Sequence, residues 1–231
     1  MRSAVRIVGI AVAAACLVAA PTRTAAQQLD TFVITPYAAV YVPTADVVSQ
    51  KAAAGPFSAA VSGRHDTALA LGANASYWIT DRFALEVGGA YAFSNVESTG
   101  ALAEPGGSLA FSQTDDAYVL LASAKVMVNM LPSSSRYNVR LGVGPAVIHR
   151  GGDGYKRDEA ELTALTNVGG AVSLCTKFPV TPRFGVRLRA ESYMYSTRIR
   201  LEDPTDNTSF RFDSKFQNDL LLSAGFQLTL R

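Results

Sequence analysis

Seven stretches of the chain alternate apolar and polar residues for about ten residues each, and an eighth stretch near the N-terminus does so less regularly. The clearest example is 83–93, where one side carries Phe83, Leu85, Val87, Tyr91 and Phe93. Small and polar residues, among them Glu86, fall on the other side. Because successive side chains of a strand point to opposite faces, each stretch predicts a strand with one apolar and one polar face.

The connections between these stretches alternate between long and short. The predicted strands are 31–42, 67–79, 83–94, 117–130, 137–149, 161–178, 184–199 and 216–230. Short turns follow the second, fourth and sixth strands, and long polar connections follow the others, including the glycine-rich segment 150–154. Pro36 inside the first strand cannot donate a ladder hydrogen bond, which weakens that assignment. This rhythm predicts an all-β, antiparallel, up-and-down barrel of eight strands.

Residues 1–26 have the layout of a secretory signal peptide. Arg2 and Arg6 precede an uncharged apolar run, and small residues precede a predicted cleavage after Ala26. The run is too short for a spanning helix. A lipoprotein signal ending at Cys16 is the alternative. The mature chain, 27–231, is then one barrel domain.

Removal of this leader changes the bulk charge. Without the three leader arginines, the 21 basic residues fall to 18 against 19 acidic residues, a formal charge of −1. This balance predicts no nucleic-acid partner. Cys175 is the only mature cysteine, so neither an intrachain disulfide nor a cysteine metal cluster is expected. We expect no cofactor and no metal.

The same alternation fits two polarities, a soluble barrel with its apolar face inside and a membrane barrel with that face outside. The polar face of 67–79 consists of Ala68, Ala70, Gly72, Asn74 and Ser76. A solvated surface would be rich in Lys and Glu, whereas a narrow lumen requires small side chains. The composition of this face therefore favours a transmembrane barrel, whose closed ring leaves no strand edge in lipid.

Aromatic residues gather near the strand ends. At the short-turn end we predict the interface aromatics Tyr77, Trp78, Phe83, Tyr137, Phe178, Phe184 and Phe226. At the long-loop end we predict Tyr91 and Phe93, together with Tyr41 and Tyr195. Two such rings are typical of the two surfaces of a bilayer.

Alternation also predicts which charged residues point inward. The predicted lumen charges are Glu86, Lys125, Arg140, Lys177, Arg187, Arg189, Glu191 and Asp219. Each needs a partner, because an unpaired buried charge is costly. The structural interpretation is a salt-bridged plug, and the functional interpretation is a gated polar path. The small interior of an eight-stranded barrel favours the plug.

The chain resembles the small eight-stranded outer-membrane barrels of Gram-negative bacteria, similar to the OmpA transmembrane domain and the OmpX group. The run 77–91 resembles the hairpin between the second and third strands of such proteins. The final strand resembles the signal read by the barrel-assembly machinery, although Arg231 replaces the usual terminal Phe. The resemblance implies an outer-membrane location, contacts with lipid and lipopolysaccharide, and assembly by that machinery.

Catalytic motifs are weak. Lipid A deacylases of this barrel class use a His and a Ser two residues apart, but Gly151 stands two residues after His149. His65 is expected to be a solvated loop residue, and 151–154 a flexible external loop. We therefore expect no enzyme. The predicted role is structural or surface interaction through four long external loops. The alternatives are an OmpW-like channel for small apolar molecules and, less favoured, a periplasmic ligand-binding barrel.

Overall fold

The computed structural model describes residues 32–54, 57–104, 107–131, 138–157, 160–163, 165–181, 183–197, 200–203, 208–211 and 215–230. The predicted signal peptide with its cleavage after Ala26, the alternative lipid site at Cys16, Tyr137 and Arg231 lie outside these residues. Among the described residues, no helix is both long and apolar enough to cross a bilayer.

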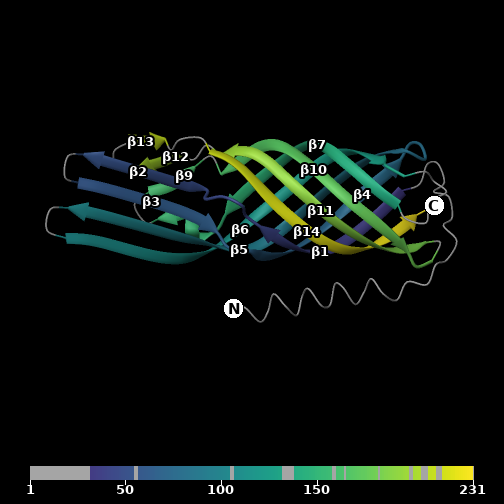
Figure 1. The fold of residues 1–231 in the computed structure, drawn as a ribbon, viewed down its shortest axis with the longest axis horizontal. Helices are drawn as coiled ribbons and strands as arrows, with labels where there is room; N and C mark the ends of the chain where they lie inside the picture. The colour runs from purple at the N-terminus through teal and green to yellow at the C-terminus, as the bar shows by residue number, and fades with distance from the viewer. Residues whose placement is uncertain are drawn as a thin grey trace.

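Eight long strands form a closed antiparallel ring (Figure 1). In ring order they are β1 (Phe32–Val42), β4 (Ala68–Trp78), β5 (Phe83–Glu104), β6 (Gly107–Asn129), β7 (Asn138–Gly151), β10 (Thr166–Pro179), β11 (Phe184–Thr197) and β14 (Lys215–Leu230). The pairing of β1 with β14 closes the ring between the first and last strands. Each strand pairs with its neighbours along the chain, which confirms the predicted up-and-down barrel of eight strands.

The long connections differ from the expected irregular loops. The first contains a hairpin of β2 (Val48–Ala54) and β3 (Phe57–His65), and β3 pairs with the extended part of β5. The second is a tight hairpin, because β5 and β6 stay paired as far as Glu104 and Gly107. We call β2, β3, residues 95–104 of β5 and residues 107–116 of β6 the projecting sheet. It extends past the barrel at one end in Figure 1.

The third and fourth long connections contribute a second small sheet. It consists of β8 (Lys156–Arg157), β9 (Ala160–Thr163), β12 (Arg200–Asp203) and β13 (Thr208–Arg211). A 3-10 turn, η1 (Asp153–Tyr155), precedes β8 and buries Tyr155. The expected flexible loop at 151–154 is therefore wrong, since Gly151 ends β7 and the next residues form this turn. The strand predicted over 161–178 is two strands, β9 and β10.

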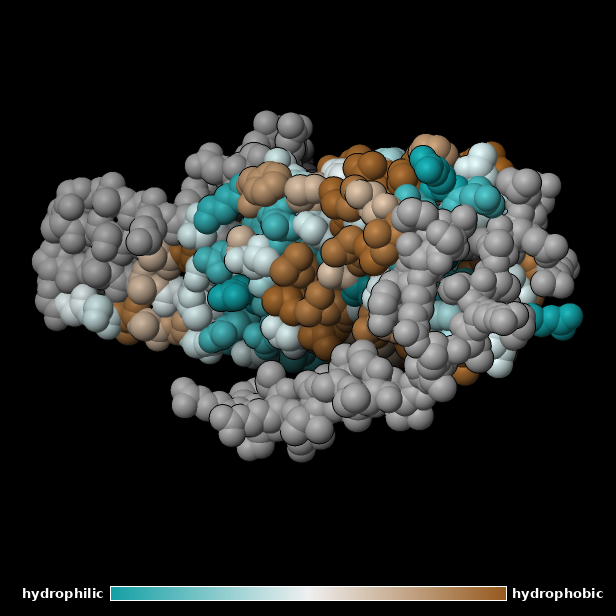
Figure 2. Space-filling model, turned by 45° about the vertical axis from the view of Figure 1, so that its right-hand side comes forward, coloured by the Kyte–Doolittle hydropathy of each residue, from teal (hydrophilic) through white to brown (hydrophobic). Residues whose placement is uncertain are grey.

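The barrel wall carries its apolar residues outside. Along β4, exposed Leu69 and Leu71 alternate with buried Ala68 and Ala70, and Val168 on β10 is 73% exposed. Figure 2 shows hydrophobic side chains gathered over the barrel wall, with a hydrophilic band beside them on the side of the projecting sheet. A soluble barrel would have the opposite polarity, because removing apolar side chains from water is favourable and would place them in the interior.

Close packing inside the barrel depends on small residues. A Cβ at Gly72 would lie 2.4 Å from Cζ of Tyr37, and a Cβ at Gly225 would lie 2.7 Å from its Cβ. These two glycines leave room for the Tyr37 side chain, whose hydroxyl donates to the carbonyl of Gly89 at 3.0 Å. The aromatic ring of Tyr37 therefore lies over the small residues of β4 and reaches the next strand, β5.

Candidate functional site

A carboxylate near the middle of the lumen gathers three cations. Glu86 on β5 is 1% exposed, and both of its oxygens accept from Nη2 of Arg189, at 2.6 and 2.7 Å. Nη2 of Arg187 lies 2.9 Å from Oε2, and Nζ of Lys125 lies 3.6 Å from Oε1. Ser76 on β4 also donates to Oε2 at 2.9 Å. The alternation of β11 produces this arrangement, because residues 187 and 189 project to the same inner face.

A second carboxylate extends this network. Glu191 contacts Nζ of Lys125, and Nη1 of Arg189 lies 3.3 Å from its Oε2. Ser123 donates to the other oxygen at 3.1 Å, and Asn74 accepts from Arg189 at 3.1 Å. Five charged side chains, two acidic and three basic, are thus linked across β5, β6 and β11. We call Glu86, Lys125, Arg187, Arg189 and Glu191 the central network.

The structure buries seven of the eight predicted lumen charges, and Lys177 is half-buried. Asp219, one of the three predicted acidic residues of the lumen, does not pair with the arginines of β11. Asp219 accepts from the hydroxyls of Tyr41 and Tyr195 at 2.8 and 2.5 Å, and Nη2 of Arg150 lies 3.7 Å away. Strand alternation predicts the face of a residue but not its height in the barrel, so the sequence alone does not identify the partner of Asp219.

Arg150 is a lumen residue, although the sequence predicts a long connection at this position. It lies in β7, is 1% exposed, and its guanidinium carbon is 4.9 Å from the centroid of the Tyr195 ring. The signal was available, because Arg150 continues the inward alternation of Ile148. Tyr41 and Tyr195, predicted as interface aromatics of the long-loop end, also point inward, because both stand on the inward side of their strand's alternation.

We call Asp219, Tyr41, Tyr195 and Arg150 the Asp219 cluster. An apolar layer lies between the central network and this cluster. Its buried side chains include Leu121, Ile148, Tyr193 and Leu221. Along β6, Leu121 stands two residues from Ser123, and along β7, Ile148 stands two residues from Arg150. The described part of the lumen is therefore filled by two charged layers with apolar and tyrosine side chains between them.

His65 is buried above the Asp219 cluster, in contrast to the expected solvated residue. We call its contact with Tyr155 the latch. It is 1% exposed, with Nε2 2.6 Å from the hydroxyl of Tyr155 and Nδ1 3.1 Å from the hydroxyl of Ser94. Burial, with a contribution from Arg150, lowers the pKa of His65 to about 3. Burial raises the pKa of Tyr155. A neutral imidazole thus joins β3 to the turn η1.

Trp78 is not an interface residue. It is 1% exposed and points into the lumen, where the guanidinium carbon of Arg140 lies 4.4 Å from its ring centroid. Neighbouring residues of a strand face opposite ways, so Tyr77 and Trp78 cannot both face lipid. Six of the predicted interface aromatics, Tyr77, Phe83, Tyr91, Phe93, Phe184 and Phe226, are exposed, and Phe178 is half-buried.

His149 belongs to an aromatic cluster on the outer wall. Its ring centroid is 6.1 Å from that of Tyr118, which stacks on Tyr91 at 5.3 Å, and its Nδ1 is 2.8 Å from the hydroxyl of Thr166. No group of His, Cys, Asp and Glu among the described residues could hold a metal ion.

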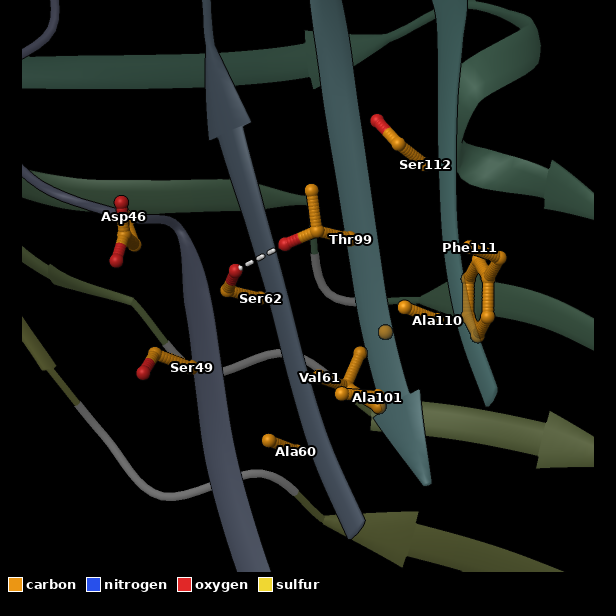
Figure 3. A pocket seen from close by; sticks show the side chains of 11 residues that line it. Asp46, Ser49, Ala60, Val61, Ser62, Thr99, Ala101, Ala110, Phe111 and Ser112 are labelled. Atoms are coloured by element: carbon orange, nitrogen blue, oxygen red, sulfur yellow. Dashed lines mark hydrogen bonds between the residues drawn. The ribbon is translucent and has the colours of Figure 1, made fainter. Parts of the chain in front are cut away.

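The projecting sheet carries a hollow of about 700 Å³ lined by hydroxyl residues and alanines and by the larger apolar residues Val61 and Phe111 (Figure 3). Four hydroxyl residues stand in register across its strands, in the order Ser49, Ser62, Thr99 and Ser112. The hydroxyls of Ser62 and Thr99 are 2.7 Å apart. Asp46 and a row of alanines (Ala60, Ala101 and Ala110) also line the hollow. Since residues paired directly across strands share a face, the hydroxyls form one row.

This hydroxyl row lies on the same face as the barrel's outer wall. The pairing of β5 with β6 runs without interruption from Phe83 to Glu104, so side chains alternate regularly along β5. Thr99 therefore faces the same way as Phe93, three alternations farther from the barrel. The row stands just beyond the aromatic cluster of Tyr91, Phe93 and Tyr118.

Three solved structures are similar to this chain. The outer membrane protein OprG from Pseudomonas aeruginosa matches with a TM-score of 0.62 and 13% identity, over 89% of this chain and 98% of that one. AlkL, determined in DMPC lipid bilayers, matches with 0.57 and 12%, over 92% and 95%. Neisserial surface protein A matches with 0.50 and 14%, over 85% and 96%.

These likenesses establish the fold as that of the small outer-membrane β-barrels. Neither a scan against protein-family models nor a search of the curated proteins finds a match. The resemblance to the OmpA and OmpX groups stays a prediction.

Proposed function

We propose that the protein is an integral barrel of the bacterial outer membrane that acts at the cell surface through its projecting sheet. Its polarity supports this location, because exposed leucines and valines cover the wall and charged residues fill the interior. The aromatic residues at the two ends of the wall fit the two bilayer surfaces. Export by the signal peptide 1–26 and insertion by the barrel-assembly machinery belong to the same proposal.

The observation that carries the surface role is the division of the molecule into a filled lumen and an extended outer sheet. The central network, the apolar layer and the Asp219 cluster follow one another along the axis of the described lumen. An interior only wide enough for side chains leaves little room for a permeating solute. The strands β5 and β6, by contrast, continue beyond the wall and expose a broad face.

The chemistry of the hollow favours a glycan, and we assign it to the sugars of neighbouring lipopolysaccharide. Hydroxyl groups both donate and accept hydrogen bonds, which matches the hydroxyls of a sugar. The alanine row provides a flat surface beside them, and Asp46 adds an acceptor. The row faces sideways from the barrel axis, above the aromatic cluster, at the level where lipid headgroup sugars would surround the barrel.

Conductance tests the lumen half of this proposal. The refolded protein in a planar bilayer should show no steady ionic current. A steady current would instead favour the alternative of an OmpW-like channel, with the charges lining a path.

Binding of purified lipopolysaccharide core oligosaccharide tests the surface half. The double variant Ser62→Ala/Thr99→Val removes two hydroxyls at nearly constant volume and should weaken binding several-fold. Ser98→Ala is the matched control, because Ser98 stands next to Thr99 on the opposite face of β5. Equal affinities for wild type and the double variant would remove the glycan assignment.

A further inference from the structure

The lumen near the short turns carries an excess of positive charge. Besides the central network, it contains Arg140, which is 1% exposed, and the half-buried Lys177. Among the described inward-facing residues of this half of the barrel there are five cations, Lys125, Arg140, Lys177, Arg187 and Arg189, and two carboxylates, Glu86 and Glu191. Asp219 cannot help, because it lies in the separate cluster with Arg150.

The cations nearest the short-turn mouth lie close together. Lys177 on β10 is the direct cross-strand partner of Arg187 on β11, and both are near enough to Arg140 for mutual repulsion. Across the lumen, the Arg140 guanidinium stacks on Trp78. We call Trp78, Arg140, Lys177, Arg187 and Gln227 the lower chamber. Within this group, Arg187 contacts the carboxylate of Glu86, which Arg189 and Lys125 already share.

Several buried donors in the lower chamber have no acceptor among the described residues. They are Nε and Nη1 of Arg187, Nε1 of Trp78 and Nε2 of Gln227, whose Oε1 acceptor is also unpaired. All three residues are at least nine-tenths buried. Gln227 stands two residues beyond Gly225, the cross-strand partner of Arg187, on the same inner face. A buried donor that is left unpaired destabilises the fold, and more so when the group is charged.

We propose that the lower chamber is a binding site for a small oxyanion, of the phosphate or carboxylate class, that enters at the short-turn mouth past Lys177. An oxyanion supplies both missing elements, negative charge and hydrogen-bond acceptors. Guanidinium and indole N–H groups are suited to its oxygens. Lys177, the half-buried cation of the group, stands where a solute from the short-turn side first meets the chamber. This assignment adds a ligand site to a lumen otherwise explained as a plug.

Trp78 offers a direct readout, because it is the single tryptophan of the chain and lies in the chamber. The refolded full chain in detergent micelles is titrated with inorganic phosphate at pH 7, with ionic strength held constant by chloride. We expect a saturable change in tryptophan fluorescence and a rise in the urea midpoint over the same concentrations.

Two variants at the same end of the barrel, one of a lysine and one of an arginine, distinguish phosphate binding at a site from general electrostatic screening by phosphate ions. Lys177→Gln keeps the central network intact and should weaken phosphate binding at least several-fold. Arg183→Gln removes an exposed cation of the neighbouring turn and should leave binding unchanged. Three results would overturn the proposal: no saturable response, an equal response when chloride alone is varied, or equal losses in the two variants.

Discussion

Nη2 of Arg189 donates to both carboxylate oxygens of Glu86, at 2.6 and 2.7 Å, although the two residues lie 103 positions apart in the sequence. In the ring of eight strands, β5 and β11 stand opposite each other. This ion pair therefore crosses the lumen instead of joining neighbouring strands. It fixes the separation of two walls and blocks the axis at that level.

Replacement of Glu86 should strongly destabilise the barrel. Glu86→Ala leaves Arg187 and Arg189 without their shared carboxylate in a buried setting, which typically costs about 3–5 kcal/mol. The urea unfolding midpoint of the refolded protein in lipid bilayers should fall accordingly. Asp81→Asn, a change of charge in an exposed turn, is the control and should have no effect. Unchanged stability of Glu86→Ala, together with steady conductance of the wild type, would show that the charges line a path.

The wall of the barrel could be predicted because one physical constraint acts on every second residue. In the membrane-facing part, one face of each strand meets an apolar surface and the other meets a narrow interior, so alternation identifies Leu222 as outward and Arg187 as inward. The projecting sheet is not under this constraint. Both of its faces carry exposed residues, such as Leu109 and Ser112, so the sequence there lacks alternation and its strands were expected to be loops.

The pairing inside the lumen could not be predicted, because it depends on the stagger between strands. Asp219 and Arg187 point inward as expected, yet they lie in different layers. Trp78 illustrates a different error: it was assigned by residue type, although its parity relative to Tyr77 already indicated the interior. The polar neighbours of His65 in the sequence favour a solvated residue, whereas tertiary contacts with Tyr155, Ser94 and Tyr41 bury it.

An arginine on the outer wall should be costly only within the membrane-facing part. Leu222 and Leu109 are both exposed leucines, at 49% and 70%, but Leu222 lies on the wall and Leu109 on the projecting sheet. If Leu222 faces lipid near the midplane, Leu222→Arg should cost about 2–4 kcal/mol in bilayer refolding titrations. Leu109→Arg should cost nothing measurable there. Equal folding of both variants would mean that the face assignment is inverted.

The fluorescence of Trp78 should be insensitive to the lipid. Its ring lies in the lumen under Arg140, so quenchers on lipid acyl chains are separated from it by the barrel wall. In vesicles of brominated phospholipid, the wild-type emission should remain close to that in unlabelled lipid. The double variant Tyr77→Trp/Trp78→Phe moves the indole to the outer face and should be strongly quenched. Strong quenching of the wild type would restore Trp78 to the interface.

The latch of His65 and Tyr155 should open in mild acid. In the folded protein, burial and Arg150 lower the pKa of His65 to about 3 from its ordinary 6.5. Between these values the open state binds a proton that the closed state excludes, so the latch is fully stable above pH 6.5 and weakens as the pH falls. The closed state should lose about 2 kcal/mol on going from pH 7 to pH 5, at about 1.4 kcal/mol per pKa unit.

Hydrogen exchange measures this opening at the amides of Tyr155 and Asp66, which donate to the carbonyls of Gly152 and Asn95. After correction for the intrinsic pH dependence of exchange, their protection should fall about thirtyfold between pH 7 and pH 5, as 2 kcal/mol requires. His65→Gln has no titrating group in the latch and should show no such fall. His149→Gln, which removes the chain's second histidine, located on the outer wall, should behave as wild type. A parallel loss of protection in His65→Gln would mean that another group controls the latch.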